Sequence, residues 1–265
     1  MNPPYAESRL VTRPEDCYFY HTMEIPGLGV VEGQWDLRDG VDAYAGQLDY
    51  AKKRVLEIGT ASGFLCFWME QQGAEVVAYD LSEDQAWDVV PYATAPGEEF
   101  AAERKAIMRR INNGWWYAHR AFGSRAKVVY GTVYEIPESI GPVDIATYCS
   151  VLLHVRDPFQ ALYRGSLLAT ETMVVTDLIG PKGADHPAGV HPGSGLPQMS
   201  FIPDFKTATP PETWWFLSPE IVQAFLGVLG FADSTVSSHV QGGALGDYDL
   251  FTVVAHRTAG RAVGA

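Results

Sequence analysis

The sequence lacks the features that mark disulfide-rich, membrane-spanning or secreted proteins. It has three cysteines in 265 residues, and Cys17, Cys66 and Cys149 match neither a disulfide framework nor a zinc-binding spacing. No apolar run approaches the roughly 18 residues that would span a bilayer. The segment 1–20 also lacks the basic and then apolar pattern of a signal peptide. We therefore expect a cytoplasmic protein that is neither secreted by that route nor inserted in a membrane.

Positive charge is scarce as well. The chain has 19 Lys and Arg against 32 Asp and Glu, which gives a net charge of -13 at pH 7. Because nucleic-acid binding draws its affinity from cations that neutralise phosphates, we expect no nucleic-acid partner. One local exception is the stretch 104–127, where seven Lys and Arg residues surround aromatic ones. Such a stretch can serve a phosphate-bearing or sugar ligand, but its simplest interpretation is a helix whose cations face water.

Length and composition fit one α/β domain, because a hydrophobic content of 47% can fill a sizeable core. Apolar runs with strand character alternate with helical patterns along the chain. This alternation predicts a mostly parallel sheet with helices on both faces. The predicted strands are residues 54–58, 75–79, 126–130, 143–148, 173–177, 234–240 and 250–256.

Two insertions follow strand ends, where open α/β sheets bind ligands. Residues 82–124 are too long for an ordinary connection and carry a helical pattern over 98–119, which predicts a cap. Residues 180–213 are rich in Pro and Gly and show no helix or strand periodicity, so we expect a long loop that acts as a lid. The domain itself spans 51–265, preceded by an N-terminal segment over 1–50.

The most informative stretch is VLEIGTASG at 55–63, followed by VVAYD at 76–80. It predicts a buried strand, a glycine turn, a helix and a second strand that ends in a carboxylate. The glycines allow backbone N–H groups to approach a ligand, and Asp80 is placed to accept hydrogen bonds from a ribose. The dinucleotide fingerprint needs glycine at two positions that are Ala61 and Phe64 in this chain, so NAD is disfavoured.

The turn resembles motif I of the class I S-adenosylmethionine (SAM) methyltransferases, in which an acidic residue stands two positions before the first glycine, as Glu57 does. Ala61 takes the place of the middle glycine. The segments 149–158 and 214–219 are similar to a subgroup that includes tRNA wobble-uridine carboxymethyltransferases and sugar and small-molecule O-methyltransferases. The resemblance implies a Rossmann-like sheet of seven strands, the last two forming an antiparallel hairpin, with 1–50 closing over the cofactor.

The resemblance also implies how SAM is held. Glu57 would orient the ammonium of the amino-acid tail, and Asp80 would bind the ribose hydroxyls. Thr132 stands where the family has an acidic residue for the adenine amino group, so adenine recognition would depend more on the Val133 backbone and on apolar stacking. The full set of implied cofactor residues is Glu57, Gly59, Thr60, Ala61, Gly63, Asp80, Leu81, Thr132, Val133 and Ser150.

A hydroxyl acceptor must lose a proton as it attacks the methyl group, so a base is expected beside the cofactor. His154 follows the fourth predicted strand, and imidazole titrates in the useful range, so it is the candidate general base. The alternative is that it only shapes the pocket. Asp177 ends the fifth strand as a second acid/base candidate or metal ligand, or as a turn cap. Magnesium is left open, and His186 and His191 could reach the acceptor if the lid closes.

These features predict a SAM-dependent O-methyltransferase that acts on a hydroxyl of a small metabolite, with a sugar or glycoside as the leading candidate. The aromatic residues at 115–116 and 214–216 could pack on a sugar ring or in the core. The alternatives are a tRNA wobble-uridine modifier, an N- or C-methyltransferase of secondary metabolism, and a non-catalytic SAM-binding protein. Oligomeric state is open, with a homodimer as one option.

Overall fold

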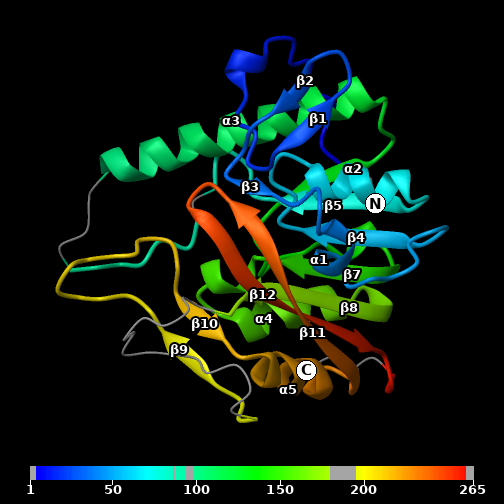
Figure 1. Cartoon of the computed structure of the whole chain (residues 1–265), viewed down its shortest axis with the longest axis vertical. Coiled ribbons are helices and arrows are strands. Elements are labelled where there is room, and N and C mark those ends of the chain that lie inside the picture. Colours follow the sequence, from blue (N-terminus) through cyan, green and yellow to red (C-terminus); the bar gives the residue numbers. More distant parts are fainter. Residues whose placement is uncertain (1–3, 86, 94–97, 180–194, 261–265) are drawn as a thin grey trace.

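A computed structural model describes residues 4–85, 87–93, 98–179 and 195–260. Its centre is an eight-stranded sheet with the order β3-β11-β12-β8-β7-β4-β5-β6 (Figure 1). All seven predicted strands are present. The strands of this sheet are β3 (Trp35–Asp36), β4 (Arg54–Ile58), β5 (Glu75–Asp80), β6 (Lys127–Tyr130), β7 (Val143–Cys149), β8 (Ala169–Leu178), β11 (Asp233–Gly243) and β12 (Gly246–His256).

The pairing of the strands confirms the predicted fold class. β6, β5, β4, β7 and β8 run parallel to one another, whereas β12 is antiparallel to both β8 and β11. The last two long strands therefore form the expected antiparallel hairpin. The eighth strand, β3, comes from the N-terminal segment and pairs with β11. Its two residues are too few to show an alternating pattern in the sequence.

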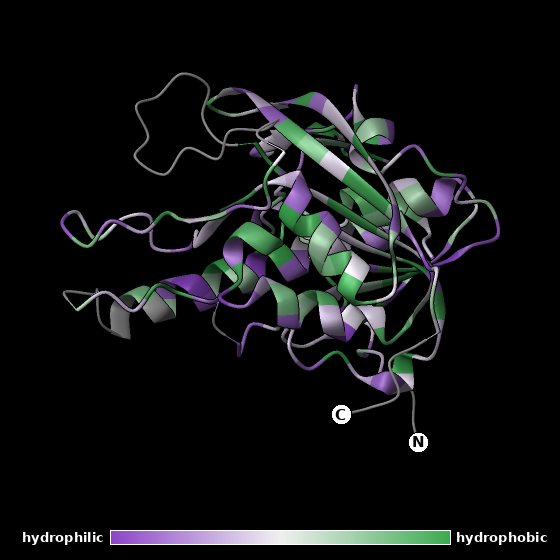
Figure 2. Ribbon diagram, turned by 90° about the horizontal axis from the view of Figure 1, so that it is seen from below, coloured by the Kyte–Doolittle hydropathy of each residue, from purple (hydrophilic) through white to green (hydrophobic). Residues whose placement is uncertain are grey.

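Helices cover both faces of the sheet, which explains why β4 and β5 are buried almost throughout. One core cluster lies between the sheet and α2 (Phe64–Gln71) and α3 (Glu98–Phe122). The other lies between the sheet and α4 (Pro158–Ser166) and α5 (Pro219–Val228). A short α1 (Val41–Tyr44) precedes β4. Figure 2 shows hydrophobic residues along the central strands and hydrophilic residues mainly in the outer loops.

The N-terminal segment contains a 3-10 turn at Pro14–Asp16 and the antiparallel pair β1 (Met23–Ile25) and β2 (Gly29–Val31). The Tyr20 N–H donates to the Ser62 hydroxyl in the glycine turn at 3.0 Å. The Tyr18 N–H donates to the Arg110 carbonyl on α3 at 2.8 Å. The segment is thereby tied to both the glycine turn and the first insertion, and its closing over a cofactor stays a prediction.

The secondary structure of the first insertion was predicted correctly from the sequence, whereas that of the second was not. The predicted helix over 98–119 is confirmed as α3, which continues to Phe122. The expectation of a loop without strands over 180–213 is wrong at β9 (Met199–Phe201), which pairs with β10 (Trp215–Leu217), because three residues are too few to show periodicity. Residues 180–194, with His186 and His191, lie outside the described part of the chain. Within the described part, no helix combines the length and apolarity needed to span a membrane.

Candidate functional site

A cavity of about 660 Å³ opens at the carboxyl ends of β4, β5, β6 and β7. The N-terminal segment contributes Tyr18 and Tyr20 to its wall, and α3 contributes Arg104, Ile107 and Met108. Both the position and the volume are typical of small-molecule sites in open α/β sheets, which measure roughly 300 to 1,000 Å³. Seven of the predicted site residues line the cavity, namely Gly59, Ala61, Asp80, Leu81, Thr132, Val133 and His154.

The glycine turn after β4 has the backbone shape that the motif requires. Gly59 has φ +83°, and a Cβ there would lie 2.5 Å from the Val151 side chain, so no larger residue fits. Ala61 also has a positive φ, at +47°. The alanine therefore keeps the left-handed backbone of the glycine that it replaces, at a modest conformational cost.

Asp80 at the end of β5 is held in one orientation by two backbone donors. The N–H groups of Ala61 and Leu81 each donate to a different carboxylate oxygen at 2.7 Å. Burial raises the pKa of Asp80 to about 6, and these two hydrogen bonds oppose the rise. The side chain is therefore ionised at neutral pH, and each oxygen keeps a lone pair for a ligand hydroxyl.

The backbone after β6 forms the next part of the wall. The Tyr79 hydroxyl donates to the Thr132 carbonyl at 2.9 Å. A Cβ on Gly131 would overlap that hydroxyl, so only glycine permits this approach. Thr132 and Val133 consequently face the cavity beside Asp80, where the resemblance expects adenine.

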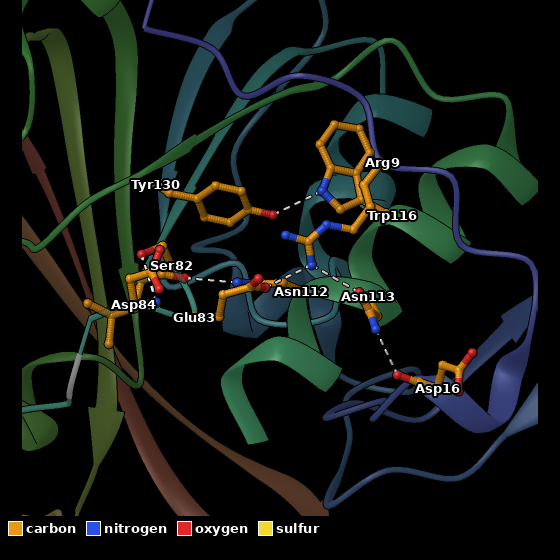
Figure 3. A network of polar contacts seen from close by, with 10 residues as sticks. Arg9, Asp16, Ser82, Glu83, Asp84, Asn112, Asn113, Trp116 and Tyr130 are labelled. Carbon is orange, nitrogen blue, oxygen red and sulfur yellow. Dashed lines mark hydrogen bonds and ion pairs between the residues drawn. The ribbon is translucent and has the colours of Figure 1, made fainter. Parts of the chain in front are cut away.

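A polar network holds the loop after β5 against the N-terminal segment and α3 (Figure 3). One Arg9 nitrogen donates to the Glu83 carboxylate at 2.9 Å and to the Asn113 side chain at 3.0 Å. The Asn112 amide donates to the Leu81 carbonyl at 3.2 Å. The N-terminal segment and α3 thereby hold this loop, and Asn112 fixes Leu81 at the cavity.

Four predicted cofactor residues, Glu57, Thr60, Gly63 and Ser150, lie next to the cavity but not on its wall. Glu57 is 2% exposed, and one of its carboxylate oxygens has no hydrogen-bond partner among the described residues. Burial raises the pKa of Glu57 to about 8. An unpaired buried acid beneath the glycine turn fits the ammonium of a SAM tail, which would lower that pKa again. Ser150 accepts a hydrogen bond from the Tyr44 hydroxyl at 3.0 Å.

His154 ends the 3-10 turn Leu152–His154 that follows β7, and it faces the cavity. Its Nδ1 lies 2.6 Å from the Glu212 carbonyl oxygen. Because a carbonyl only accepts, Nδ1 must carry the proton, and Nε2 is left with a lone pair. The surrounding protein lowers the pKa of His154, and the Glu212 carbonyl opposes this. A lowered pKa favours the neutral ring, which is the form that a base needs.

The structure does not bring Asp177 to the cavity. The side chain is 1% exposed and accepts hydrogen bonds from the N–H groups of Leu153 at 3.2 Å and Leu178 at 2.8 Å. Burial raises the pKa of Asp177 to about 7. The side chain thus anchors the turn that carries His154, without contact with the cavity. Among the described residues, no three His, Cys, Asp or Glu side chains gather as they would around a metal ion.

Most of the polar residues on this wall were not predicted from the sequence, because the insertions carry no recognisable motif, whereas Arg104 belongs to the basic stretch 104–127 for which a ligand role was considered. Trp87, Asp88, Arg104 and Glu212 line the wall together with Tyr134. The Tyr134 hydroxyl makes a short hydrogen bond to the Asp88 carboxylate. The Nε of Arg104 lies 2.5 Å from a Glu212 carboxylate oxygen. Charged and hydroxyl groups therefore share this wall with His154.

The aromatic residues proposed as a platform for a sugar do not line the cavity. Trp115 is 1% exposed in the core between α2 and α3, where its ring packs on Phe67 and His119. Trp214 is also buried and donates its indole N–H to the Asp88 carbonyl at 2.5 Å. Core packing explains these side chains, and the aromatic surface of the cavity comes instead from Tyr18, Tyr20, Trp87 and Tyr134.

The sheet order, the glycine turn and the acidic end of β5 define a class I SAM-dependent methyltransferase. The family model described as "Methyltransferase domain" matches residues 33–170, more than half of the chain. The chain therefore belongs to the methyltransferase domain family. No curated protein sequence matches it.

Solved structures with the same fold are distant in sequence. One is the 1,6-didemethyltoxoflavin-N1-methyltransferase of Burkholderia thailandensis with 1,6-didemethyltoxoflavin and S-adenosylhomocysteine, at TM-score 0.52 and 15% identity, covering 84% of this chain and 78% of that one. Another is the magnesium protoporphyrin IX methyltransferase of Synechocystis PCC 6803 with S-adenosylhomocysteine, at TM-score 0.51 and 15% identity, covering 84% and 82%. A SAM-dependent methyltransferase of Methanosarcina mazei has TM-score 0.53 and 12% identity, covering 79% and 94%. At these identities the likeness concerns the fold.

Proposed function

We propose that the protein transfers the methyl group of SAM to a hydroxyl of a small metabolite, with a sugar or glycoside as the leading acceptor class. The observation that carries the proposal is the His154 ring, which lies on the same cavity as Asp80 and has its proton fixed on Nδ1 by the Glu212 carbonyl. A neutral imidazole with a free Nε2 is suited to take the proton of an attacking hydroxyl.

The cofactor half of the cavity would be formed by the glycine turn, Asp80 and Thr132. Asp80 would accept the ribose hydroxyls, and the backbone at Ala61 would lie along the amino-acid tail. Bound SAM supplies an electrophilic methyl group on a sulfonium. The chain's own task is then to align the acceptor oxygen in line with that group, to exclude water and to accept one proton.

The acceptor half supports a polar ring as substrate. Asp88, Arg104, Tyr134 and Glu212 offer charged and hydroxyl partners for several substrate hydroxyls, and the indole of Trp87 offers an apolar face. A cavity of about 660 Å³ also suits a cofactor and one small acceptor. Two neighbours of similar fold are named for ring-shaped small molecules, one of them methylated at a nitrogen, so the fold accepts such acceptors without deciding the acceptor atom.

The alternative of a tRNA substrate has less support, because the net charge is -13 and nucleic-acid affinity comes mainly from cations. We accordingly propose no nucleic-acid partner. The alternatives of N- or C-methylation depend less on a general base than O-methylation does. A large loss of turnover on replacing His154 would therefore favour O-methylation over them.

The test is transfer of labelled methyl from SAM to a panel of sugars, glycosides, aromatic alcohols, amines and bulk tRNA. We expect label on hydroxyl acceptors, and we expect the variant His154→Gln to bind SAM normally while losing turnover. Label on amines or carbon centres would overturn the O-methyl proposal, and label on tRNA would favour the wobble-uridine alternative. SAM binding without transfer to any acceptor would favour a non-catalytic protein.

A further inference from the structure

The two insertions of the chain are joined to each other beside His154. The Val90 N–H donates to the Pro211 carbonyl at 2.9 Å, and the Tyr92 hydroxyl donates to the Pro210 carbonyl at 3.0 Å. Residues 210–212 are therefore held by the first insertion as well as by their own chain neighbours. This matters because Glu212, whose carbonyl contacts His154, is the last residue of that short stretch.

The side chain of Glu212 is itself held by α3. Its carboxylate lies 2.5 Å from the Nε of Arg104, with side-chain exposures of 21% for Arg104 and 24% for Glu212. The Arg104 guanidinium also lies over the rings of Phe100, at 4.5 Å from the centroid, and Trp87, at 5.3 Å. A partly buried guanidinium held by two aromatic faces and a carboxylate has little freedom to move. Arg104 thus restrains Glu212 from a different segment of the chain.

We propose that Arg104 and Glu212 are positioning residues for the base: the ion pair holds the Glu212 backbone so that its carbonyl keeps the His154 proton on Nδ1 and leaves Nε2 free. This inference rests on the proposed function, in which Nε2 receives a proton. As the acceptor oxygen bonds to the methyl group, the methyl–sulfur bond breaks and the acceptor proton moves to Nε2. The resulting imidazolium keeps its Nδ1–H bond to the Glu212 carbonyl, which stabilises the new charge.

The tautomer of His154 depends on Glu212 because, among the described residues, the Glu212 carbonyl is the one hydrogen-bond partner of the His154 ring. Without that carbonyl, the imidazole reverts to the tautomer with the proton on Nε2, which histidine prefers in water. A ring in that tautomer faces the acceptor with a donor and cannot take its proton. Through Arg104 and Glu212, α3 would therefore determine which nitrogen of His154 carries the proton, although α3 makes no hydrogen bond to the His154 ring.

The direct test is the nitrogen-15 spectrum of the histidine-labelled protein, which distinguishes the two neutral tautomers and needs no acceptor. The His154 signal is assigned by its loss in His154→Gln. We expect Nδ1–H in the wild type and a shift towards Nε2–H in Arg104→Gln. Arg104→Lys, which keeps the charge, should restore part of the native signal, and Glu212→Gln should behave like Arg104→Gln.

The matched control is Lys105→Gln, which removes a cation from the exposed neighbouring position on α3. We expect it to leave the His154 signal unchanged. Circular dichroism and the other histidine signals establish that each variant is folded. With an acceptor in hand, Arg104→Gln should lower kcat about tenfold at unchanged SAM affinity.

Three results would distinguish a failure of the positioning role from a failure of His154 as the base. A wild-type His154 with its proton on Nε2, or an Nδ1–H signal that persists in folded Arg104→Gln and Glu212→Gln, would overturn the positioning role. Full turnover in His154→Gln would instead remove the base from the proposed function, while the tautomer response to Arg104 would still establish the coupling.

Discussion

The replacement Asp80→Asn tests the cofactor half of the site. In the structure each carboxylate oxygen accepts one backbone N–H at 2.7 Å, from Ala61 and from Leu81. Asparagine supplies one acceptor oxygen, so its amide N–H₂ must face the other backbone donor. The variant thereby loses both the charge and half of the fixed geometry that would receive the ribose hydroxyls.

The size of the effect follows from the number of hydrogen bonds. A hydrogen bond to a charged group contributes roughly 1.5–3 kcal/mol, against about 1 kcal/mol for a neutral pair. With two ribose hydroxyls the loss is about 3 kcal/mol, which is about a 100-fold weaker SAM affinity. Titration calorimetry at pH 8 measures this. The control Asp84→Asn removes an exposed carboxylate from the same loop and should leave the affinity within about twofold.

The pH dependence provides a second readout. Burial raises the pKa of Asp80 to about 6, and the ionised form is the one that accepts ribose hydroxyls. The ionisation of Asp80 should therefore add a fall in wild-type affinity below about pH 6, on top of the pH dependence that Glu57 gives to both proteins, and Asp80→Asn should lack that added fall. An Asp80→Asn affinity within threefold of the wild type, or the same pH dependence in both proteins, would refute the assignment of Asp80.

Three further substitutions test the base, the buried acid beneath the glycine turn and the polar network at Arg9. His154→Gln should lower kcat about 100-fold or more without weakening SAM binding, and the acid limb of the wild-type rate profile should lie below pH 6.5, because the protein lowers the pKa of His154. In the cofactor-free protein, burial raises the pKa of Glu57 to about 8, so its ionisation should lower stability from pH 5 to 8, and Glu57→Gln should make that fall smaller in chemical denaturation, leaving the part due to Asp80 and Asp177. Arg9→Met should weaken SAM binding only about threefold in calorimetry, because the ion pair with Glu83 is partly exposed, and a much larger loss would contradict that estimate.

Local patterns account for the parts of the fold that the sequence predicts well. β4 and β5 are short, mostly apolar strands, the first followed by a glycine turn and the second ending in an acid, so their positions and the place of Asp80 at a strand end follow from neighbouring residues. β3 and β9 have two and three residues, and β3 pairs with β11, which lies far away in the sequence, whereas β9 pairs with β10 across the connecting segment. Such strands are determined by tertiary contacts rather than by periodicity.

In the candidate site, too, some residues belong to a local sequence pattern and others are brought together only by tertiary contacts. The glycine turn and Asp80 belong to one local motif, whereas Arg104 and Glu212 meet across 108 positions through the docking of two insertions. No pattern in either insertion predicts that contact. Asp177 shows the converse: its place at a strand end is predictable, but two backbone donors turn its side chain away from the cavity.

The most direct test of the central claim is the crystal structure of the complex with S-adenosylhomocysteine. We expect the ribose on Asp80, the adenine against Leu81 and Val133, and the sulfur directed at the part of the cavity that His154 faces, with room for an acceptor oxygen about 3 Å from the vacant methyl position. A ligand bound elsewhere, or a sulfur directed away from the His154 ring, would contradict it.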